Sequence, residues 1–343
     1  MKKVSKISQR KNEHLEICLE GSVESSVSPG FEKIQIRHQS LPEINFNEID
    51  IGLSFLGKNL KAPLLISSMT GGSAEGERYN MILAEAAETF GIAMGVGSQR
   101  AAIEDPKLEL TFQVRKVAPN VLLFANLGAV QLNYGYSISE VKRAIDMIEA
   151  DALFLHLNPL QEALQPEGNT NFVGILRKIE ALCEKLETPI VVKEVGSGIS
   201  AQLAKALFDS GVAAVDCAGL GGTSWALVEG QRQENPQMRE ICQQFGTWGI
   251  PTVDCLLDYQ KTGIKGNIIA SGGIRSGLDV YKSLALGAKL AGMALPMIKA
   301  ADKGLDYLRR TIEAYLVELR VAMFTSGVQS LDDITTSRIT IKE

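Results

Sequence analysis

The sequence has 343 residues, of which 45% are hydrophobic and 22% charged, and it carries a net charge of -5. This composition is typical of a globular protein with a substantial core, and the acidic balance without a basic patch argues against nucleic-acid binding. No apolar run approaches the roughly 18 residues of a membrane span, and no apolar secretory signal opens the chain. The five cysteines are far apart and include no C-x-x-C pair, which favours a reducing compartment. We therefore expect a soluble cytoplasmic protein.

The first sixty residues differ in composition from the rest, because they are rich in serine, glutamate and lysine. We interpret residues 1–60 as an N-terminal extension that covers part of the following domain. No linker interrupts the later sequence, so residues 61–343 are expected to form one structural domain, which is permitted at this length.

Eight short apolar runs of strand length recur after the extension. They are Pro63–Ser67, Ile92–Val96, Val121–Asn126, Ala152–Leu157, Ile190–Glu194, Ala213–Cys217, Ile268–Ala270 and Leu290–Ala294. Runs that are apolar on both faces and separated by helical patterns are typical of strands buried in a parallel sheet. Most of their ends lie about 23 to 37 residues apart, close to the length of one strand-plus-helix unit.

Amphipathic stretches between the strands predict the outer helices. They are Tyr79–Phe90, Val141–Ala150, Phe172–Leu186, Ala201–Asp209 and Leu278–Leu286, with a closing helix over Lys303–Thr325. Ser137 with Glu140, and Ser276 with Asp279, have the spacing of a capping box at a helix start. The wide gap Gly222–Asn267 is expected to hold an inserted loop and further helices.

The repeated strand-helix pattern predicts a (β/α)8 TIM barrel. A doubly wound parallel sheet is the structural alternative, because it has the same alternation. Eight units, and the absence of Gly-x-Gly-x-x-Gly after the first strand, favour the barrel.

In such a barrel the active site is built from the carboxyl ends of the strands, and these ends are polar here. The turn Ser271–Gly277 has glycines that let backbone amides approach a phosphate, and it opens a helix whose dipole favours an anion. A simple tight turn is the structural alternative, which Arg275 makes less attractive. We predict a phosphate site at this turn.

Other strand ends leave their roles open. Lys193 ends a strand, where a side chain at the rim is the plain alternative to a functional amine. His156 and Asn158 share one face of a strand and would point into the barrel mouth. Glu162 would suit Mg²⁺, or be a solvated carboxylate. Cys217 reads as a packing residue.

Taken together, the motifs resemble one family, the type 2 isopentenyl diphosphate isomerases, which are FMN-dependent barrels. The matching pieces run in order along the chain: Arg10-Lys11-x-x-His14, Ser68–Gly72, Gly97–Arg100, Asn126–Gly128, His156–Glu162, Lys193-Glu194, Gly221–Trp225 and Ser271–Arg275. By composition alone, the first of these is an uninformative charged segment. Ala218 departs from the pattern, because some members have a serine there that touches the flavin.

The resemblance implies the residues of the site. FMN contacts would be Ser68, Met69, Thr70, Ser98, Asn126, Lys193, Thr223, Gly272, Gly273, Arg275, Ala294 and Leu295. Substrate contacts would be Arg10, Lys11, Ser98, Gln99, Arg100, His156, Asn158 and Gln161, with Glu162 on Mg²⁺. The family also implies a homotetramer or larger assembly, and a substrate site to which the extension contributes.

The implied reaction converts isopentenyl diphosphate into dimethylallyl diphosphate by adding a proton at one carbon and removing one two positions away. We hypothesise that reduced FMN is the acid–base group, with Lys193 stabilising its anionic form, Gln161 assisting the proton relay and His156 beside them. NADPH or another reductant would reduce the flavin.

Three alternatives remain, and the first two, which are enzymes, share the glycine turn. A 2-hydroxy-acid oxidase needs a histidine after the sixth strand, where this chain has Gly219–Ser224, and an inosine monophosphate dehydrogenase needs a cysteine in a glycine-rich loop. A non-catalytic flavin- or phosphate-binding scaffold would have no use for Arg10, Lys11, Gln161 and Glu162. The sequence therefore favours the isomerase.

Overall fold

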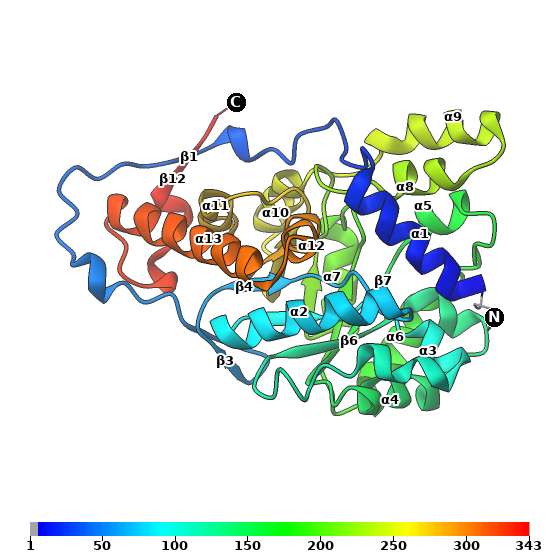
Figure 1. Cartoon of the computed structure of the whole chain (residues 1–343). Coiled ribbons are helices and arrows are strands. Elements are labelled where there is room, and N and C mark those ends of the chain that lie inside the picture. Colours follow the sequence, from blue (N-terminus) through cyan, green and yellow to red (C-terminus); the bar gives the residue numbers. More distant parts are fainter. Residues whose placement is uncertain (1–5, 343) are drawn as a thin grey trace.

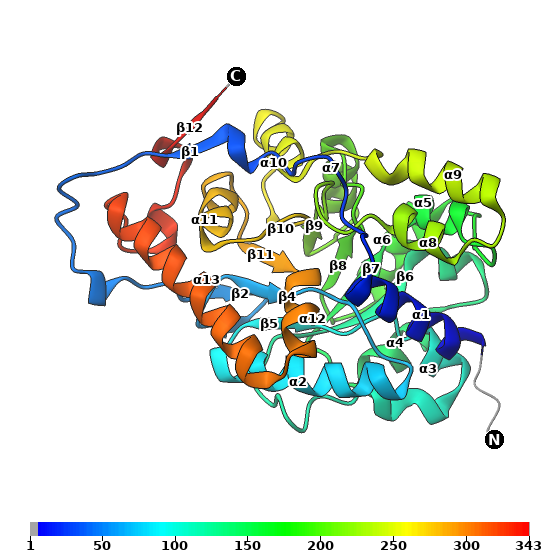
Figure 2. The same cartoon turned by 45° about the horizontal axis from the view of Figure 1, so that its top comes forward.

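Eight parallel strands close into a barrel in the computed structural model, which describes residues 6–342 (Figures 1 and 2). In order around the barrel they are β4 (Leu64–Ile66), β5 (Ala93–Gly95), β6 (Leu123–Gly128), β7 (Ala152–His156), β8 (Ile190–Lys193), β9 (Ala214–Asp216), β10 (Asn267–Ser271) and β11 (Leu290–Met293). The last strand pairs with the first, β11 with β4. The predicted barrel and its eight strands are confirmed, and the doubly wound alternative is wrong because no strand of this sheet has a free edge.

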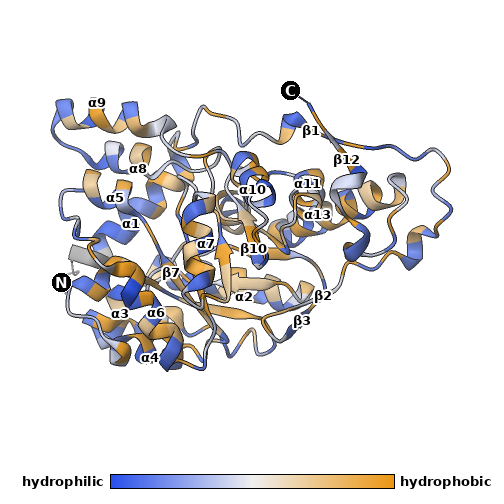
Figure 3. Cartoon of the chain, turned by 180° about the vertical axis from the view of Figure 1, so that it is seen from behind, coloured by the Kyte–Doolittle hydropathy of each residue, from blue (hydrophilic) through white to orange (hydrophobic). Residues whose placement is uncertain are grey.

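Helices surround the barrel. They are α2 (Ala74–Phe90), α3 (Arg100–Glu104), α4 (Ile138–Met147), α5 (Pro159–Leu164), α6 (Ile175–Lys185), α7 (Ala201–Asp209), α8 (Trp225–Arg232), α9 (Pro236–Gln244), α10 (Thr252–Lys261), α11 (Gly277–Ala285), α12 (Leu295–Asp302) and α13 (Leu305–Thr325). All five predicted outer helices are present. The predicted insertion between β9 and β10 contains α8, α9 and α10. Figure 3 shows the hydrophobic colour on the barrel strands, and both hydrophobic and hydrophilic colours on the outer helices.

Two details of the helix predictions differ from the structure. The closing helix does not start at Lys303, because α12 ends at Asp302 and α13 begins after Gly304, whose φ of +102° favours glycine. The box at Ser137 and Glu140 is complete, with both reciprocal hydrogen bonds. At the second predicted box, Ser276 Oγ accepts from Asp279 N, but the Asp279 carboxylate accepts from Arg275 N instead of closing the box.

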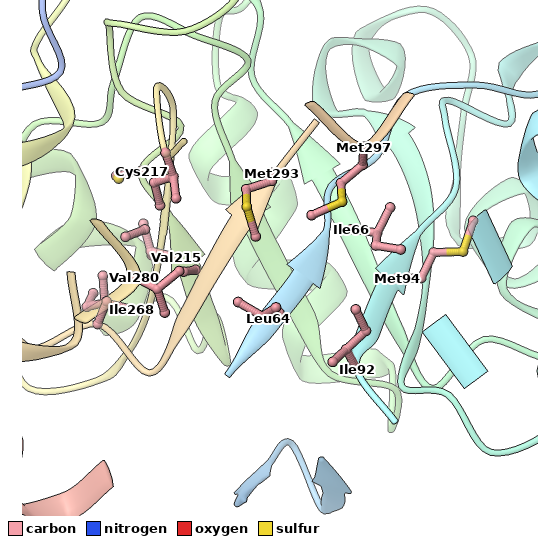
Figure 4. Close-up of a cluster of buried hydrophobic side chains, with 14 of the residues drawn as sticks. Leu64, Ile66, Ile92, Met94, Val215, Cys217, Ile268, Val280, Met293 and Met297 are labelled. Carbon is pink, nitrogen blue, oxygen red and sulfur yellow. The ribbon is translucent and has the colours of Figure 1, made fainter. Parts of the chain in front are cut away.

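Alternation along the strands divides the core into two layers. Leu64, Ile66 and Met94 point outward toward the helices, in the cluster that Figure 4 shows with Met293 and the buried Cys217. The residues between them point inward and fill the barrel toward the amino ends of the strands. They include Leu65, Ala93, Phe124, Phe154, Val191 and Ile269. The rings of Phe124 and Phe154 stack there with centroids 4.3 Å apart.

The N-terminal residues reach both ends of the barrel. The hairpin of β2 (Leu53–Phe55) and β3 (Lys58–Leu60) packs Phe55 and Leu60 against the inward layer and closes the amino end. Farther out, β1 (Ile34–Ile36) pairs antiparallel with β12 (Ile339–Ile341). The helix α1 (Lys6–Glu20) lies at the opposite, carboxyl end, against α8 and α12.

The first five residues of the predicted extension and Glu343 lie outside the described residues. Among residues 6–342, no helix combines the length and apolar character that a membrane crossing requires.

Candidate active site

A cavity of about 250 Å³ opens at the carboxyl end of the barrel, beneath α1. All eight strand ends contribute to it, as does one face of α1. With one exception, Gln99, every residue that the sequence predicts for the site lines this cavity: Arg10, Lys11, Ser68, Met69, Thr70, Ser98, Arg100, Asn126, His156, Asn158, Gln161, Glu162, Lys193, Thr223, Gly272, Gly273, Arg275, Ala294 and Leu295.

Two glycine-rich loops pack against one another at one end of the cavity. Gly272 and Gly273 have φ values of +100° and +73°. A Cβ on Gly272 would lie 2.0 Å from the Gly219 carbonyl oxygen, and one on Gly222 would lie 2.7 Å from Gly273 N. Larger residues are therefore excluded sterically, and bare backbone faces the cavity beside the first turn of α11. Exposed backbone of this kind beside a helix start can form a cradle for a phosphate group.

Arg275 follows this cradle and lines the cavity. Its guanidinium binds the carboxylate of Glu24, and its Nη1 donates to the Ile274 carbonyl at 2.9 Å. The cation is thus held beside the glycine turn.

A buried ionic group lies under the cavity. Lys193 and Asp216 are register partners on β8 and β9 and point to the same side. Burial lowers the pKa of Lys193, and the negative charges of Asp216 and Glu194 oppose this effect. Lys193 Nζ donates to the Glu194 carbonyl at 2.5 Å, while Asp216 Oδ1 accepts from Ser271 Oγ at 2.6 Å.

The loop after β8 is fixed by the Glu194 carboxylate. Glu194 Oε2 accepts hydrogen bonds from the backbone N–H groups of Val195, Gly196 and Ser197, at 2.7, 2.7 and 2.5 Å. Lys193 is therefore presented from a rigid strand end.

His156 is neutral, and its hydrogen bonds determine its tautomer. Burial, together with the charges of Lys193 and Lys11, lowers its pKa to about 3. Asn126 Nδ2 donates to the Val96 carbonyl at 3.1 Å, so Asn126 Oδ1 is the atom that lies 2.8 Å from His156 Nδ1. Because an amide oxygen only accepts, the proton is on Nδ1 and the Nε2 lone pair remains available.

Gln161 is oriented by a buried carboxylate. Its Nε2 donates to Glu229 Oε1 at 2.9 Å, and its Oε1 accepts from Asn158 Nδ2 at 3.1 Å. Glu229 also pairs with Arg232 at 2.7 Å and with His14 Nε2 at 3.0 Å. Burial by itself would raise the pKa of Glu229, but these partners outweigh burial and lower it. Both polar atoms of the Gln161 amide are therefore fixed.

Glu162 is a buried carboxylate surrounded by donors. Its Oε1 accepts from Asn158 Nδ2 at 3.0 Å, and its Oε2 accepts from Gln165 Nε2 and Asn169 N at 2.6 and 2.5 Å. Within residues 6–342 no cluster of three or more His, Cys, Asp or Glu side chains could hold a metal ion by itself. A metal at Glu162 would thus need oxygens from water or a ligand.

Basic side chains lie on the α1 side of the cavity. Lys11 Nζ donates to the Ser98 carbonyl at 2.6 Å, and burial together with the charge of Arg10 lowers its pKa to about 7. Arg10 pairs with Glu167 at 3.3 Å. Arg100 pairs with Glu104 at 2.7 Å and donates to Asn169 Oδ1. An anionic ligand is expected to meet these cations at the mouth.

Gln99 is the exception, because the structure does not place its side chain where the predicted contact with the substrate requires. Its side chain is fully buried and turned away from the cavity, where Nε2 donates to the Ala144 carbonyl at 2.7 Å and Oε1 accepts from Asn126 N at 2.9 Å. These bonds use the amide to join β6 to α4. Its role is therefore structural.

The sequence analysis also missed several residues that support the side chains of the site. Asp216 offered a signal, because a carboxylate between Val215 and Cys217 in an apolar strand needs a partner. Glu229 offered none, since a glutamate on an amphipathic helix is typical of a solvated face. Glu167 looked like an ordinary loop residue.

Comparison with known proteins agrees with this geometry. The profile of the FMN-dependent dehydrogenase family matches residues 22–115 and 160–341. An isopentenyl-diphosphate delta-isomerase of Nostoc sp. is 50% identical over 326 residues, covering 95% of this chain and 93% of the relative. One of Rickettsia canadensis is 46% identical over 331 residues, covering 96% and 97%.

Solved structures show the same fold at low identity. A flavocytochrome b2 variant with benzoylformate has a TM-score of 0.71 at 17% identity, covering 96% of this chain and 82% of that one. A lactate oxidase of Pediococcus acidilactici has a TM-score of 0.68 at 16% identity, covering 98% and 94%. At these identities the similarity concerns the fold alone.

Proposed function

The chain belongs to the FMN-dependent isopentenyl-diphosphate delta-isomerases, and from this premise we propose which side chains of the cavity bind the cofactor and the substrate. It interconverts isopentenyl diphosphate and dimethylallyl diphosphate. The assignment of residues rests on one observation. The cavity has a glycine cradle at one end and the cations of α1 and α3 at the other. One cavity therefore offers two separate anion sites.

The residues at the strand ends fit FMN. The cradle of Gly272 and Gly273 suits its phosphate, and the hydroxyls of Ser67 and Ser68 line the cavity buried, with no hydrogen-bond partner among the described residues. These unpaired hydroxyls could form hydrogen bonds with the polar atoms of a bound ligand. The residues that would hold FMN are Ser68, Met69, Thr70, Ser98, Asn126, Lys193, Thr223, Gly272, Gly273, Arg275, Ala294 and Leu295.

When bound in its reduced form, FMN supplies the acid–base group that the allylic proton exchange needs. Lys193 would hold positive charge toward this cofactor when protonated, in surroundings where a charge acts strongly because water is excluded. The carboxylates of Asp216 and Glu194 favour the charged form of this lysine. NADPH is the proposed source of electrons for the flavin.

The substrate diphosphate would bind across the mouth from the cradle. Arg10, Lys11 and Arg100 supply positive charge there, and Ser98 and Asn158 supply hydrogen-bonding groups. His156 presents an unprotonated Nε2 in the ligand-free state, so it would need to take up a proton before donating to a diphosphate oxygen. Arg10 would have to leave Glu167 to reach the same anion.

Glu162 is the proposed ligand of Mg²⁺. This ion typically binds one or two carboxylates and completes its octahedron with water and phosphate oxygens. Its binding would displace donors that now occupy the carboxylate, such as Asn158 and Gln165.

We propose that Gln161 lies beside the allylic carbons of the substrate and assists proton transfer there. Its amide lines the cavity, and its hydrogen bonds with Glu229 and Asn158 fix its orientation before a substrate binds between the diphosphate site and the cradle. A fixed amide of this kind can position or relay a proton.

The assembly is proposed to be a homotetramer or larger.

Conversion under reducing conditions tests the function. The purified yellow protein is incubated anaerobically with isopentenyl diphosphate, NADPH and Mg²⁺, and the methyl signals of dimethylallyl diphosphate are followed by NMR. Gln161→Ala is expected to retain FMN and lose turnover. Replacement of FMN by a 5-deaza analogue tests the acid–base role, which undiminished turnover would rule out.

A further inference from the structure

Phe112 lies behind the proposed diphosphate site and has no role in the assignments above. It is the last residue of a 3-10 helix, η3 (Pro106–Phe112), and its side chain is fully buried. The Lys11 ammonium lies over its ring, with Nζ 4.9 Å from the ring centroid. A lysine over an aromatic face at this distance makes a cation–π interaction.

Two glycines make this arrangement possible. A Cβ on Gly71 would lie 2.1 Å from Phe112 Cε1 and 2.5 Å from its Cδ1, so it would overlap the ring. A Cβ on Gly72 would lie 2.9 Å from Lys11 Cδ and 3.0 Å from its Nζ. The pair after β4 therefore leaves room for the ring at one position and for the lysine stem at the next.

The ring is fixed by hydrogen bonds of its neighbour in the chain. Thr111 Oγ1 accepts from Gly72 N at 2.8 Å, which ties η3 to the glycine pair. Asn80 Nδ2, on α2, donates to the Thr111 carbonyl at 2.9 Å. Phe112 is thus placed from two sides before any ligand binds.

The Lys11 ammonium is held between two groups. One of its three N–H donors is used by the Ser98 carbonyl, at 2.6 Å, and the Phe112 ring covers another side. Lys11 also lines the cavity, so its remaining donor capacity faces the ligand space.

We propose that Phe112 is a positioning residue for the diphosphate site, whose ring holds the Lys11 side chain in place and favours its charged form. This inference rests on the proposed function, because it takes Lys11 to bind the substrate diphosphate. A lysine has a long flexible stem, and ordering this stem on binding costs conformational entropy. The Phe112 ring, called the platform below, orders the Lys11 stem before the ligand binds.

The surroundings of Lys11 make such support necessary. Burial and the adjacent Arg10 lower its pKa, so a substantial fraction of the ligand-free protein has the neutral amine at pH 8. The other titratable or charged side chains that line the same cavity are Arg10, His14, Cys18, Arg100, His156, Glu162, Lys193 and Arg275. Among these Glu162 is the carboxylate, and its oxygens are occupied by Asn158, Gln165 and Asn169. The ring face is a source of negative potential in contact with the ammonium.

A fluorinated series tests the platform without emptying the core. Phe112 is replaced by 4-fluoro-, 3,5-difluoro- and 3,4,5-trifluorophenylalanine, which keep the ring shape while withdrawing electron density from its face. The probe is inorganic diphosphate, and its Kd on the FMN-bound protein is measured by calorimetry at pH 8. Affinity is expected to fall stepwise with each fluorine, to a total of roughly 3- to 30-fold.

Two controls separate this effect from a structural one. The same substitutions at Phe124, also fully buried but stacked on Phe154 at the closed end, are expected to leave the Kd unchanged. In a Lys11→Met background, fluorination at Phe112 should have no further effect.

The outcomes distinguish the two proposals. Equal Kd values across the Phe112 series at pH 8, with diphosphate bound by the unmodified protein, would overturn the platform and leave the proposed function intact. A fluorine effect that persists in Lys11→Met would also overturn it. If the unmodified protein binds no inorganic diphosphate, the proposed diphosphate site is wrong and the platform fails with it. With isopentenyl diphosphate, Phe112→Leu is expected to raise KM severalfold with kcat retained.

Discussion

Gln161 Nε2 donates a 2.9 Å hydrogen bond to Glu229 Oε1, across 68 residues of sequence. The same carboxylate pairs with Arg232 and lies 3.0 Å from His14 Nε2. One fully buried charge therefore orients the amide proposed to face the allylic carbons and also connects it to α1. The orientation of Gln161 therefore depends on the charge of Glu229, and a substitution at Glu229 should disturb the site.

Glu229→Gln should lower kcat by roughly 10- to 100-fold while FMN affinity is retained, because the substitution releases the orientation of Gln161. It should also lower the free energy of unfolding by about 1–3 kcal/mol, because the glutamine oxygen stays with Arg232 without its negative charge, and the new NH2 group faces the Gln161 amide. Steady-state NMR assays and thermal unfolding of the FMN-bound protein measure both effects. Glu234→Gln, at an exposed position just after α8, is the matched control. An unchanged kcat would show that Gln161 needs no such support.

His156 should remain neutral, with its proton on Nδ1, from pH 5 to pH 8 in the ligand-free protein. Its pKa is lowered to about 3, so the charged form becomes populated only when the pH falls toward that value. Nitrogen-15 NMR of histidine-labelled protein reports the tautomer, and the chain has three histidines to assign. Asn126→Asp should raise the pKa of His156, because a carboxylate would replace the amide oxygen beside Nδ1. Titration of His156 near pH 6.5 in the unmodified protein would contradict the assignment.

Diphosphate affinity should decrease as the pH rises above 7. The pKa of Lys11 is lowered from 10.5 to about 7, so the side chain is cationic below this pH and loses its charge above it. Binding at pH 8 then requires uptake of a proton, and affinity should fall by up to about tenfold per pH unit. Calorimetry in two buffers of different ionisation enthalpy measures the uptake. Lys11→Arg should remove the lysine's share of this slope, because arginine does not titrate in this range. A profile of the same slope would assign the whole proton uptake to another group, such as His156.

Glu167→Gln should tighten the binding of inorganic diphosphate. The expected gain is only about 2- to 5-fold, because a half-exposed ion pair of this kind contributes little free energy. The change frees Arg10, which now pairs with Glu167 at 3.3 Å. Glu13→Gln is the control, because Glu13 shares the partner Arg232 with Glu167. Weaker binding in Glu167→Gln would mean that the loop carboxylate helps the site instead of competing with the ligand.

Phe55→Ala should destabilise the protein by about 3–5 kcal/mol without changing FMN affinity. Phe55 fills the amino end of the barrel, whereas the cavity opens at the carboxyl end. The midpoint of thermal unfolding and the Kd for FMN are the two measurements. Leu41→Ala removes a side chain that is 72% exposed and should have little effect on either. A loss of FMN binding in Phe55→Ala would show that the two ends are coupled.

The sequence by itself determined the barrel, and its local patterns predicted a phosphate site at one strand end. Strand runs such as Val121–Asn126 and the turn Ser271–Gly277 depend on residues adjacent in the chain, and their patterns are readable because periodicity and glycine conformations are local properties. The carboxyl ends of parallel strands meet at one end of a barrel, so polar residues after each strand could be assigned to one site.

Only the tertiary structure decided how side chains divide between the site and its support. Gln99 stands between two cavity residues, Ser98 and Arg100, yet its amide is buried on the other side of the turn, because successive side chains point in different directions. The pairs Gln161 with Glu229 and Lys11 with Phe112 join segments far apart in the chain. Such contacts depend on the distances that chain folding creates, which no local pattern of residues specifies.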